Sequence, residues 1–170
     1  ALSLSDPEIP KLLLAAGADV LACETIPRLA EVEALVTELD ALGAPAWISL
    51  TTITTDDGRV LTRFGEDAGE AFALAGAASS VVAVGVNCTA PSGVGAAVRL
   101  AAQRSGRPVI VYPNSGETWD GARRTWVGSP GLDGADVASW IADGARLVGG
   151  CCRIGPDDIA ALRATPLSAR

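Results

Sequence analysis

The sequence predicts a single α/β domain over residues 1–170, built on a parallel sheet. Apolar strand-like runs alternate with amphipathic helical patterns at intervals of about 30 residues, the spacing of a βα unit. The runs are rich in Val, Ile and Leu without polar alternation, which is typical of parallel strands covered on both faces. With 170 residues, 49% of them hydrophobic, the chain is long enough for one sizeable core.

Five strands and five helices follow one another along the chain. Pro27 suits the first turn of the first helix, and Gly43 ends that helix after an apolar stripe over residues 29–39. Gly106 and Gly144 mark the ends of two later helices in the same way. The expected strands are residues 20–23, 46–50, 81–86, 109–112 and 146–148, and the later helices are expected at 66–79, 92–105, around 137–141, and at 156–164.

Two stretches between these elements, residues 51–63 and 115–133, are predicted to be long polar loops. The element order fits two architectures. One is a five-stranded doubly wound sheet, which would be complete at this length. The other is part of an eight-fold (β/α)₈ barrel, which typically needs about 250 residues. Periodicity alone does not separate the two, but in both of them ligands bind at the carboxyl ends of the strands.

Composition narrows the classes of function. A net charge of −7 argues against nucleic acid as the main partner. The sequence has no run of eighteen apolar residues, so no membrane span is expected. The sequence contains no His, which rules out a His triad, a His general base or a His-ligated metal within these residues. Four Cys in an acidic chain do not resemble a secreted disulfide framework, so a cytoplasmic location is expected. Residue 1 is not Met, and we expect a processed or truncated chain.

Three cysteines come directly after predicted strands. Cys88 follows one strand, and the pair Cys151 and Cys152 follows another after two glycines. Because the carboxyl ends of parallel strands converge on one face, the three thiols could meet there and bind zinc, which takes thiolates at about 2.3 Å. Packing as small buried side chains and a vicinal disulfide remain open alternatives. Cys23 lies inside an apolar strand and is expected in the core.

Other polar and aromatic side chains also follow predicted strands. The carboxylate of Glu24, next to Thr25, could hold a substrate ammonium, act as a base or cap the following helix. Asn114 could offer its carboxamide oxygen to a metal or ligand, or belong to an ordinary turn. Trp119 and Trp126 could face a cationic ligand or fix their loop in place.

Four segments at the strand ends carry a family pattern. They are LACETIP at 21–27, VGVNCT at 84–89, VYPNSGE at 111–117 and VGGCCR at 148–153. Together they resemble the homocysteine S-methyltransferases, in particular the branch that uses S-methylmethionine as methyl donor. The resemblance runs from about Leu12 to Leu162, and its most specific part is the Asn-Cys pair combined with Gly-Gly-Cys-Cys.

The resemblance implies a (β/α)₈ TIM barrel, in which these five strands correspond to the fourth to eighth. The family's first three βα units are then missing, and a separate N-terminal barrel segment is a candidate partner. The domain is accordingly expected to be the C-terminal portion of a homocysteine-binding barrel.

The resemblance also implies a chemistry. Cys88, Cys151 and Cys152 would bind Zn²⁺ as thiolates, and the thiol of homocysteine would become the fourth ligand. The homocysteine sulfur would take a methyl group from a sulfonium donor, either S-methylmethionine or S-adenosylmethionine, and give methionine. Glu24 would bind the homocysteine ammonium. The substrate-binding residues implied are Glu24, Thr25, Asn87 and Asn114.

Two other functions are carried as alternatives. The chain could be an inactive or partner-requiring barrel fragment. It could also be a thiol redox protein that uses the Cys151–Cys152 pair, which predicts a vicinal disulfide and no need for zinc.

Overall fold

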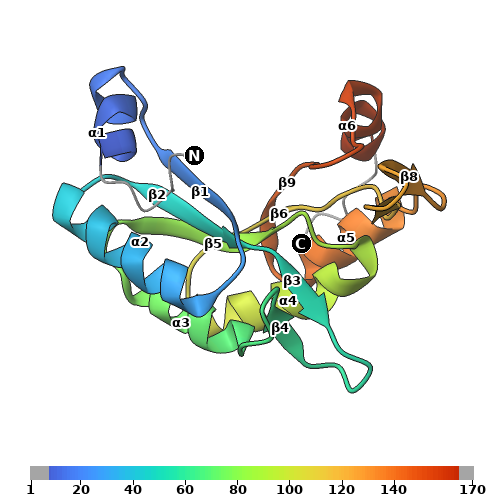
Figure 1. The fold of residues 1–170 in the computed structure, drawn as a ribbon, viewed down its shortest axis with the longest axis horizontal. Coiled ribbons are helices and arrows are strands. Elements are labelled where there is room, and N and C mark those ends of the chain that lie inside the picture. The colour runs from blue at the N-terminus through green and yellow to red at the C-terminus, as the bar shows by residue number, and fades with distance from the viewer. Residues whose placement is uncertain (1–7, 165–170) are drawn as a thin grey trace.

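The computed structural model describes residues 8–164 and contains one five-stranded parallel sheet with strand order β1-β2-β5-β6-β9 (Figure 1). The remaining residues of the predicted domain, 1–7 and 165–170, lie outside this range. All five predicted strands are present, two of them with the predicted bounds. The strands are β1 (Leu21–Ile26), β2 (Ala46–Leu50), β5 (Val81–Asn87), β6 (Val109–Tyr112) and β9 (Ala145–Val148).

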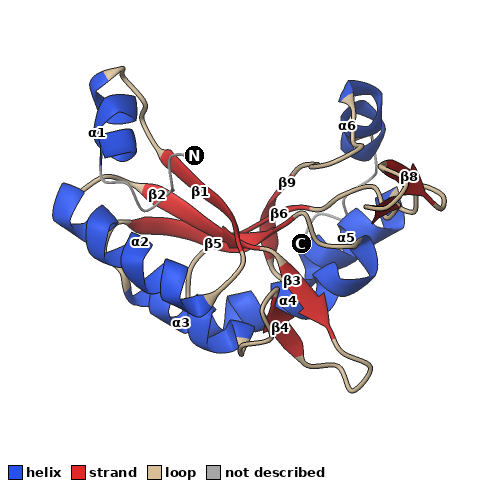
Figure 2. Cartoon of the chain, in the orientation of Figure 1, coloured by secondary structure: helices blue, strands red, loops and turns tan. Residues whose placement is uncertain are grey.

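The helices between successive strands lie along one face of the sheet (Figure 2). Each of them packs against the next, so that they form a single layer. Gly43 ends the first of them with a φ of 64°, the left-handed conformation for which a glycine was predicted there. The helices between strands are α2 (Leu29–Leu42), α3 (Ala68–Ala77), α4 (Pro91–Ser105) and α5 (Gly134–Asp143); α1 (Glu8–Ala15) precedes β1, and α6 (Pro156–Arg163) follows β9.

The hydrophobic core lies between the sheet and the helix layer. Phe72 of α3 and Leu39 of α2 are almost completely buried there, together with Ile48 of β2 and Val84 of β5. Burying such side chains contributes roughly 1.5–3 kcal/mol each, so this layer supplies much of the stability of the fold. Cys23 belongs to the same core, as predicted.

Both predicted polar loops contain an antiparallel hairpin that the sequence pattern did not reveal. The first holds β3 (Thr52–Thr54) and β4 (Val60–Thr62), and the second holds β7 (Thr118–Asp120) and β8 (Thr125–Val127). The helix α1 was not predicted either. The four hairpin strands have three residues each, too few to produce a periodic signal.

The sheet order separates the two architectures that periodicity left open. Each strand pairs with the strand of the preceding βα unit, and the order never reverses. A doubly wound sheet has such a reversal and carries helices on both faces. The described sheet has neither, so a five-stranded doubly wound sheet is excluded. Within residues 8–164, no helix combines the length and apolar character needed to cross a bilayer.

Candidate functional site

The three cysteines that follow strands meet at the carboxyl edge of the sheet. The Sγ atoms of Cys88 and Cys152 are 4.0 Å apart, and those of Cys151 and Cys152 are 3.9 Å apart. All three sulfurs lie within 4.8 Å of one another. Thiolates around a tetrahedral zinc at 2.3 Å would be separated by about 3.8 Å, so this donor set fits one ion with small adjustments.

Unusual backbone conformations direct these thiols toward one another. Among the described residues, four non-glycine residues have positive φ, and three of them lie at this edge: Thr25 (63°), Cys88 (48°) and Arg153 (68°). Strained backbone of this kind clusters at functional sites. Strand β9 ends at Val148, and after it the amide of Cys151 donates to the carbonyl of Pro113 at 2.7 Å. Because the chain turns there, two adjacent cysteines no longer point to opposite faces.

The thiols influence one another's ionisation. Burial, followed by the two neighbouring thiols, raises the pKa of Cys88 to about 12. The pKa of Cys152 is also raised, again mainly by burial and then by Cys151. Thiolates this close repel one another, so ionisation of all three is favourable only with a cation between them. All four cysteines are free thiols, which does not favour the vicinal disulfide of the redox alternative.

Glu24 and Thr25 project from a bulge in β1. The strand was predicted to end at Cys23 but continues to Ile26, and its pairing with β2 shifts register between these two residues. A bulge breaks the alternation of side chains, and Glu24 and Thr25 are both exposed although they are adjacent. The bulge therefore presents a carboxylate and a hydroxyl together at the carboxyl edge.

The Asn87 side chain is buried beneath this bulge. Its Oδ1 accepts from the amide of Thr25 at 2.8 Å and from the hydroxyl of Ser49, while its Nδ2 donates to Oγ1 of Thr25 at 2.6 Å. With three contacts already made, Asn87 holds Thr25 in its left-handed conformation and ties β1, β2 and β5 together. Ser49 was missed by sequence reasoning because a serine inside an apolar strand gave no distinct pattern.

Tyr112, at the end of β6, is a second residue of this edge that the sequence reasoning did not single out. Its hydroxyl accepts a hydrogen bond from Nε1 of Trp47 at 3.1 Å. Burial raises the pKa of Tyr112 to about 12; hydrogen bonds with Ser49 and Trp47 partly oppose this rise, and Glu24 adds to it. The phenol is therefore neutral at physiological pH and lies next to the Glu24 carboxylate as a potential donor.

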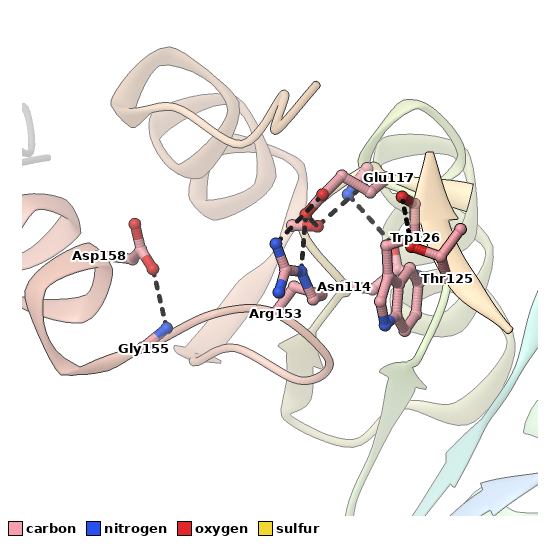
Figure 3. Close-up of polar contacts among 9 residues, drawn as sticks. Asn114, Glu117, Thr125, Trp126, Arg153, Gly155 and Asp158 are labelled. Carbon is pink, nitrogen blue, oxygen red and sulfur yellow. Dashed lines mark hydrogen bonds and ion pairs between the residues drawn. The ribbon is translucent and has the colours of Figure 1, made fainter. Parts of the chain in front are cut away.

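An ion pair fastens the loop that carries Cys151 and Cys152. Glu117 accepts from Nε of Arg153 at 3.0 Å and from Nη2 at 3.3 Å, and it also accepts from the hydroxyl of Ser115 at 2.8 Å (Figure 3). The amide of Ser115 donates to the carbonyl of Cys152 at 3.0 Å. The side chain of Glu117 is only 8% exposed, and Arg153 followed by Ser115 lowers its pKa. The ion pair thus persists until the pH falls below that lowered value.

A cavity of about 690 Å³ opens beside Cys88. It is also lined by Asn114, whose Oδ1 accepts from the amide of Gly116 at 3.4 Å as expected for the predicted turn, while its role as a ligand stays a prediction. Trp119 and Trp126 line the same cavity. Glu24, Thr25 and Asn87 lie outside it, at the ends of β1 and β5.

Fold and site together define a parallel α/β protein whose sheet carries, at its carboxyl edge, three cysteines able to ligate one metal ion. The family model for homocysteine S-methyltransferase matches residues 6–165. The chain belongs to the homocysteine S-methyltransferase family.

Individual relatives support the same assignment. The chain is 43% identical over 159 residues to homocysteine S-methyltransferase of Escherichia coli (strain K12), covering 89% of this chain and 49% of that relative. It is 38% identical over 166 residues to selenocysteine Se-methyltransferase of Brassica oleracea var. italica, covering 94% and 47%. The metallated form of the homocysteine methyltransferase MmuM from Escherichia coli superposes with a TM-score of 0.76 at 35% identity, covering 98% of this chain and 53% of that one. The chain spans about half the length of the curated relatives it matches.

Proposed function

We propose that this chain carries the metal-binding part of a zinc-dependent enzyme that transfers a methyl group from a sulfonium donor to homocysteine, giving methionine. The donor is S-methylmethionine or S-adenosylmethionine. The observation that carries the proposal is the convergence of Cys88, Cys151 and Cys152, from two different strand ends, within 4.8 Å. Three convergent thiols leave a fourth position of a tetrahedral site for a substrate sulfur, as in catalytic zinc sites.

We further infer that the five strands are the fourth to eighth of a (β/α)₈ barrel. The sequential strand order supports this, as does the helix layer on one face. Strands β1 and β9 form the two edges of the described sheet, where the remaining βα units of such a barrel would pair. A segment supplying those units is the partner that we propose for this chain.

The chemistry needed is the generation of a nucleophilic sulfur at neutral pH. A free thiol with a pKa near 8.5 is ionised to only a few per cent. Bound Zn²⁺ supplies the positive charge that keeps a coordinated substrate thiol deprotonated. The three cysteine thiolates more than offset the charge of a divalent ion, and they thereby preserve electron density on the substrate sulfur. The chain needs no general base beside the reacting carbon, which fits a sequence without His.

The remaining residues bind and position the acceptor. The Glu24 carboxylate is exposed at the bulge and pairs with the homocysteine ammonium. Thr25 lies beside it, fixed by Asn87, so these two residues shape the pocket as one unit. Asn114 lines the cavity beside Cys88 and offers its carboxamide to the metal or the substrate.

Metal removal and a methyl-transfer assay test the proposed function. The protein, joined by its N-terminal barrel segment, should form methionine from homocysteine and a sulfonium donor, as measured by mass spectrometry. Stripping the metal with a chelator should abolish turnover, and added zinc should restore it. Undiminished turnover in metal-free protein would contradict the proposal.

As a test of Glu24, the substitution Glu24→Gln should raise the KM for homocysteine by about tenfold, because one charged hydrogen bond is lost.

The Glu117–Arg153 ion pair gives a separate prediction about metal affinity. In Glu117→Gln the loop bearing Cys151 and Cys152 loses its charged contact, so zinc affinity should fall by about tenfold, as is typical for residues that support metal ligands. Competition with a chromophoric chelator measures this. Glu70→Gln, which changes an exposed carboxylate on α3, is the matched control and should bind zinc normally. Equal affinities of Glu117→Gln and the unmodified protein would show that the backbone bonds alone position the cysteines.

A further inference from the structure

Apart from Cys88 and Asn114, the residues that line the cavity beside Cys88 have no role in the binding of the acceptor described above. Its walls come from the β3 strand, the turn before α4 and the β7–β8 hairpin. A volume of about 690 Å³ is within the range of small-molecule sites and is ample for an amino-acid-sized ligand. Because Cys88 belongs both to this wall and to the sulfur cluster, a ligand in the cavity would lie next to the substrate sulfur.

The hairpin contributes two indole rings to the cavity. Trp119 and Trp126 occupy paired positions on β7 and β8, with ring centroids 5.5 Å apart and an interplanar angle of 61°. Trp119 remains 50% exposed, although it already packs edge-on against its neighbour. The face of an indole attracts cations within about 6 Å of its centroid. An accessible indole in the wall of a cavity is therefore suited to a ligand with a positive centre.

The same cavity also contains a free positive charge. Arg63 lines it, and within residues 8–164 no carboxylate lies at ion-pair distance from its guanidinium. The neighbouring arginine of this region, Arg59, is instead paired with Asp57 at 2.9 Å and does not line the cavity. A guanidinium recognises a carboxylate with two parallel hydrogen bonds. The cavity thus offers an aromatic site for a cation and a guanidinium for an anion.

We propose that this cavity binds the methyl donor as a sulfonium amino acid, with the sulfonium over Trp119 and the α-carboxylate at Arg63. The inference rests on the proposed function and adds to it the residues that recognise the donor. Such a donor carries a sulfonium in addition to the α-ammonium and α-carboxylate of every amino acid, so the sulfonium distinguishes it from ordinary amino acids and the carboxylate helps to orient it. The indole pair and Arg63 are on separate segments of the chain, so each can be tested by itself.

The assignment also accounts for release of the spent donor. In the transfer, the electron pair of the homocysteine thiolate forms a new S–CH₃ bond. The donor's S–CH₃ bond breaks, and its electron pair remains on the donor sulfur, while the thiol proton has been lost to solvent. Both products are then neutral thioethers. The demethylated donor no longer has the positive charge that the indole attracts, so the cavity should hold it more weakly than the sulfonium.

Equilibrium binding without homocysteine tests the proposal by calorimetry. Two probes separate the contributions of Trp119 and Arg63. S-methylmethionine carries both the sulfonium and the α-carboxylate, and the trimethylsulfonium ion carries only the sulfonium. Trp119→Leu should weaken binding of both probes by about tenfold, corresponding to about 1.4 kcal/mol. Arg63→Met should weaken S-methylmethionine binding while leaving trimethylsulfonium unchanged. S-adenosylmethionine in a parallel titration shows which sulfonium the cavity prefers.

Matched variants keep the test decisive. Arg59→Met removes a nearby arginine outside the cavity and should bind both probes normally. Trp119→Phe keeps an aromatic ring and should recover much of the affinity lost in Trp119→Leu. Unchanged binding and an unchanged donor KM in Trp119→Leu would overturn the assignment while leaving methyl transfer intact. Conversely, Trp119-dependent sulfonium binding in a protein that transfers no methyl group would overturn the proposed function and not this site.

Discussion

Replacing Cys88 by serine is expected to remove both zinc and methyl transfer. A serine hydroxyl stays protonated at neutral pH and is a poor zinc ligand, so the site loses one of its three thiolates. Zinc affinity should fall by more than about 100-fold, because even residues that only support ligands cost 10- to 100-fold. Metal content measured by mass spectrometry should drop from one ion per chain to nearly none, together with turnover.

Cys23→Ala provides the control for this substitution. Cys23 is buried in β1, and burial raises the pKa of its thiol to about 11, so it remains a neutral core residue. The alanine variant should keep its zinc and its activity. Full zinc occupancy and turnover in Cys88→Ser would end the three-thiol model, since the sulfur cluster would then be dispensable.

Gly85→Ala is expected to have the largest effect on stability. Gly85 lies in the middle of β5 opposite Ile110 of β6, and an added Cβ would overlap the backbone carbonyl oxygen of Ile110. No side-chain rotation can relieve a clash with backbone, so the two strands must separate. We expect a loss of at least about 3 kcal/mol in the free energy of unfolding. Urea denaturation followed by tryptophan fluorescence measures it.

Gly131→Ala is the matched control for Gly85→Ala. A Cβ at Gly131 would have no neighbour within 4 Å, so the free energy of unfolding should change by no more than about 0.5 kcal/mol. If both variants unfolded at the same urea concentration as the unmodified protein, β5 and β6 would not be packed as closely as described. Since β5 leads directly to Cys88, separation of these strands should also weaken zinc binding.

The central strands were predictable because their sequences are almost entirely apolar. The bounds of β2 and β6 coincide with the prediction, since β2 begins directly after Pro45 and β6 lies between Pro108 and Pro113. The β7–β8 hairpin and helix α1 were missed. Three-residue strands carry no measurable period, and Leu12 to Leu14 form a continuous apolar run in place of a helical stripe.

The candidate site was predictable to the extent that it follows strand ends. Alignment of the carboxyl edges brings Cys88 close to the Cys151–Cys152 pair in any parallel sheet that places their strands near each other. The bulge that presents Glu24 with Thr25 was not predictable, because it depends on a register shift against β2. The Glu117–Arg153 ion pair depends likewise on how two loops 36 residues apart fold against each other, which no local pattern encodes.

The sulfur cluster joins segments that are far apart in the chain. Cys88 and Cys152 are separated by 64 positions, and two helical crossover connections, through α4 and α5, lie between them. An ion held by both would act as a cross-link, and by the loop-closure relation used for disulfides it would disfavour the unfolded chain by about 4 kcal/mol. Such an ion can be captured only after β9 has docked. Zinc would therefore be taken up during biosynthesis only by chains that have completed their assembly. Zinc starvation would lower the amount of folded protein as well as the rate of turnover.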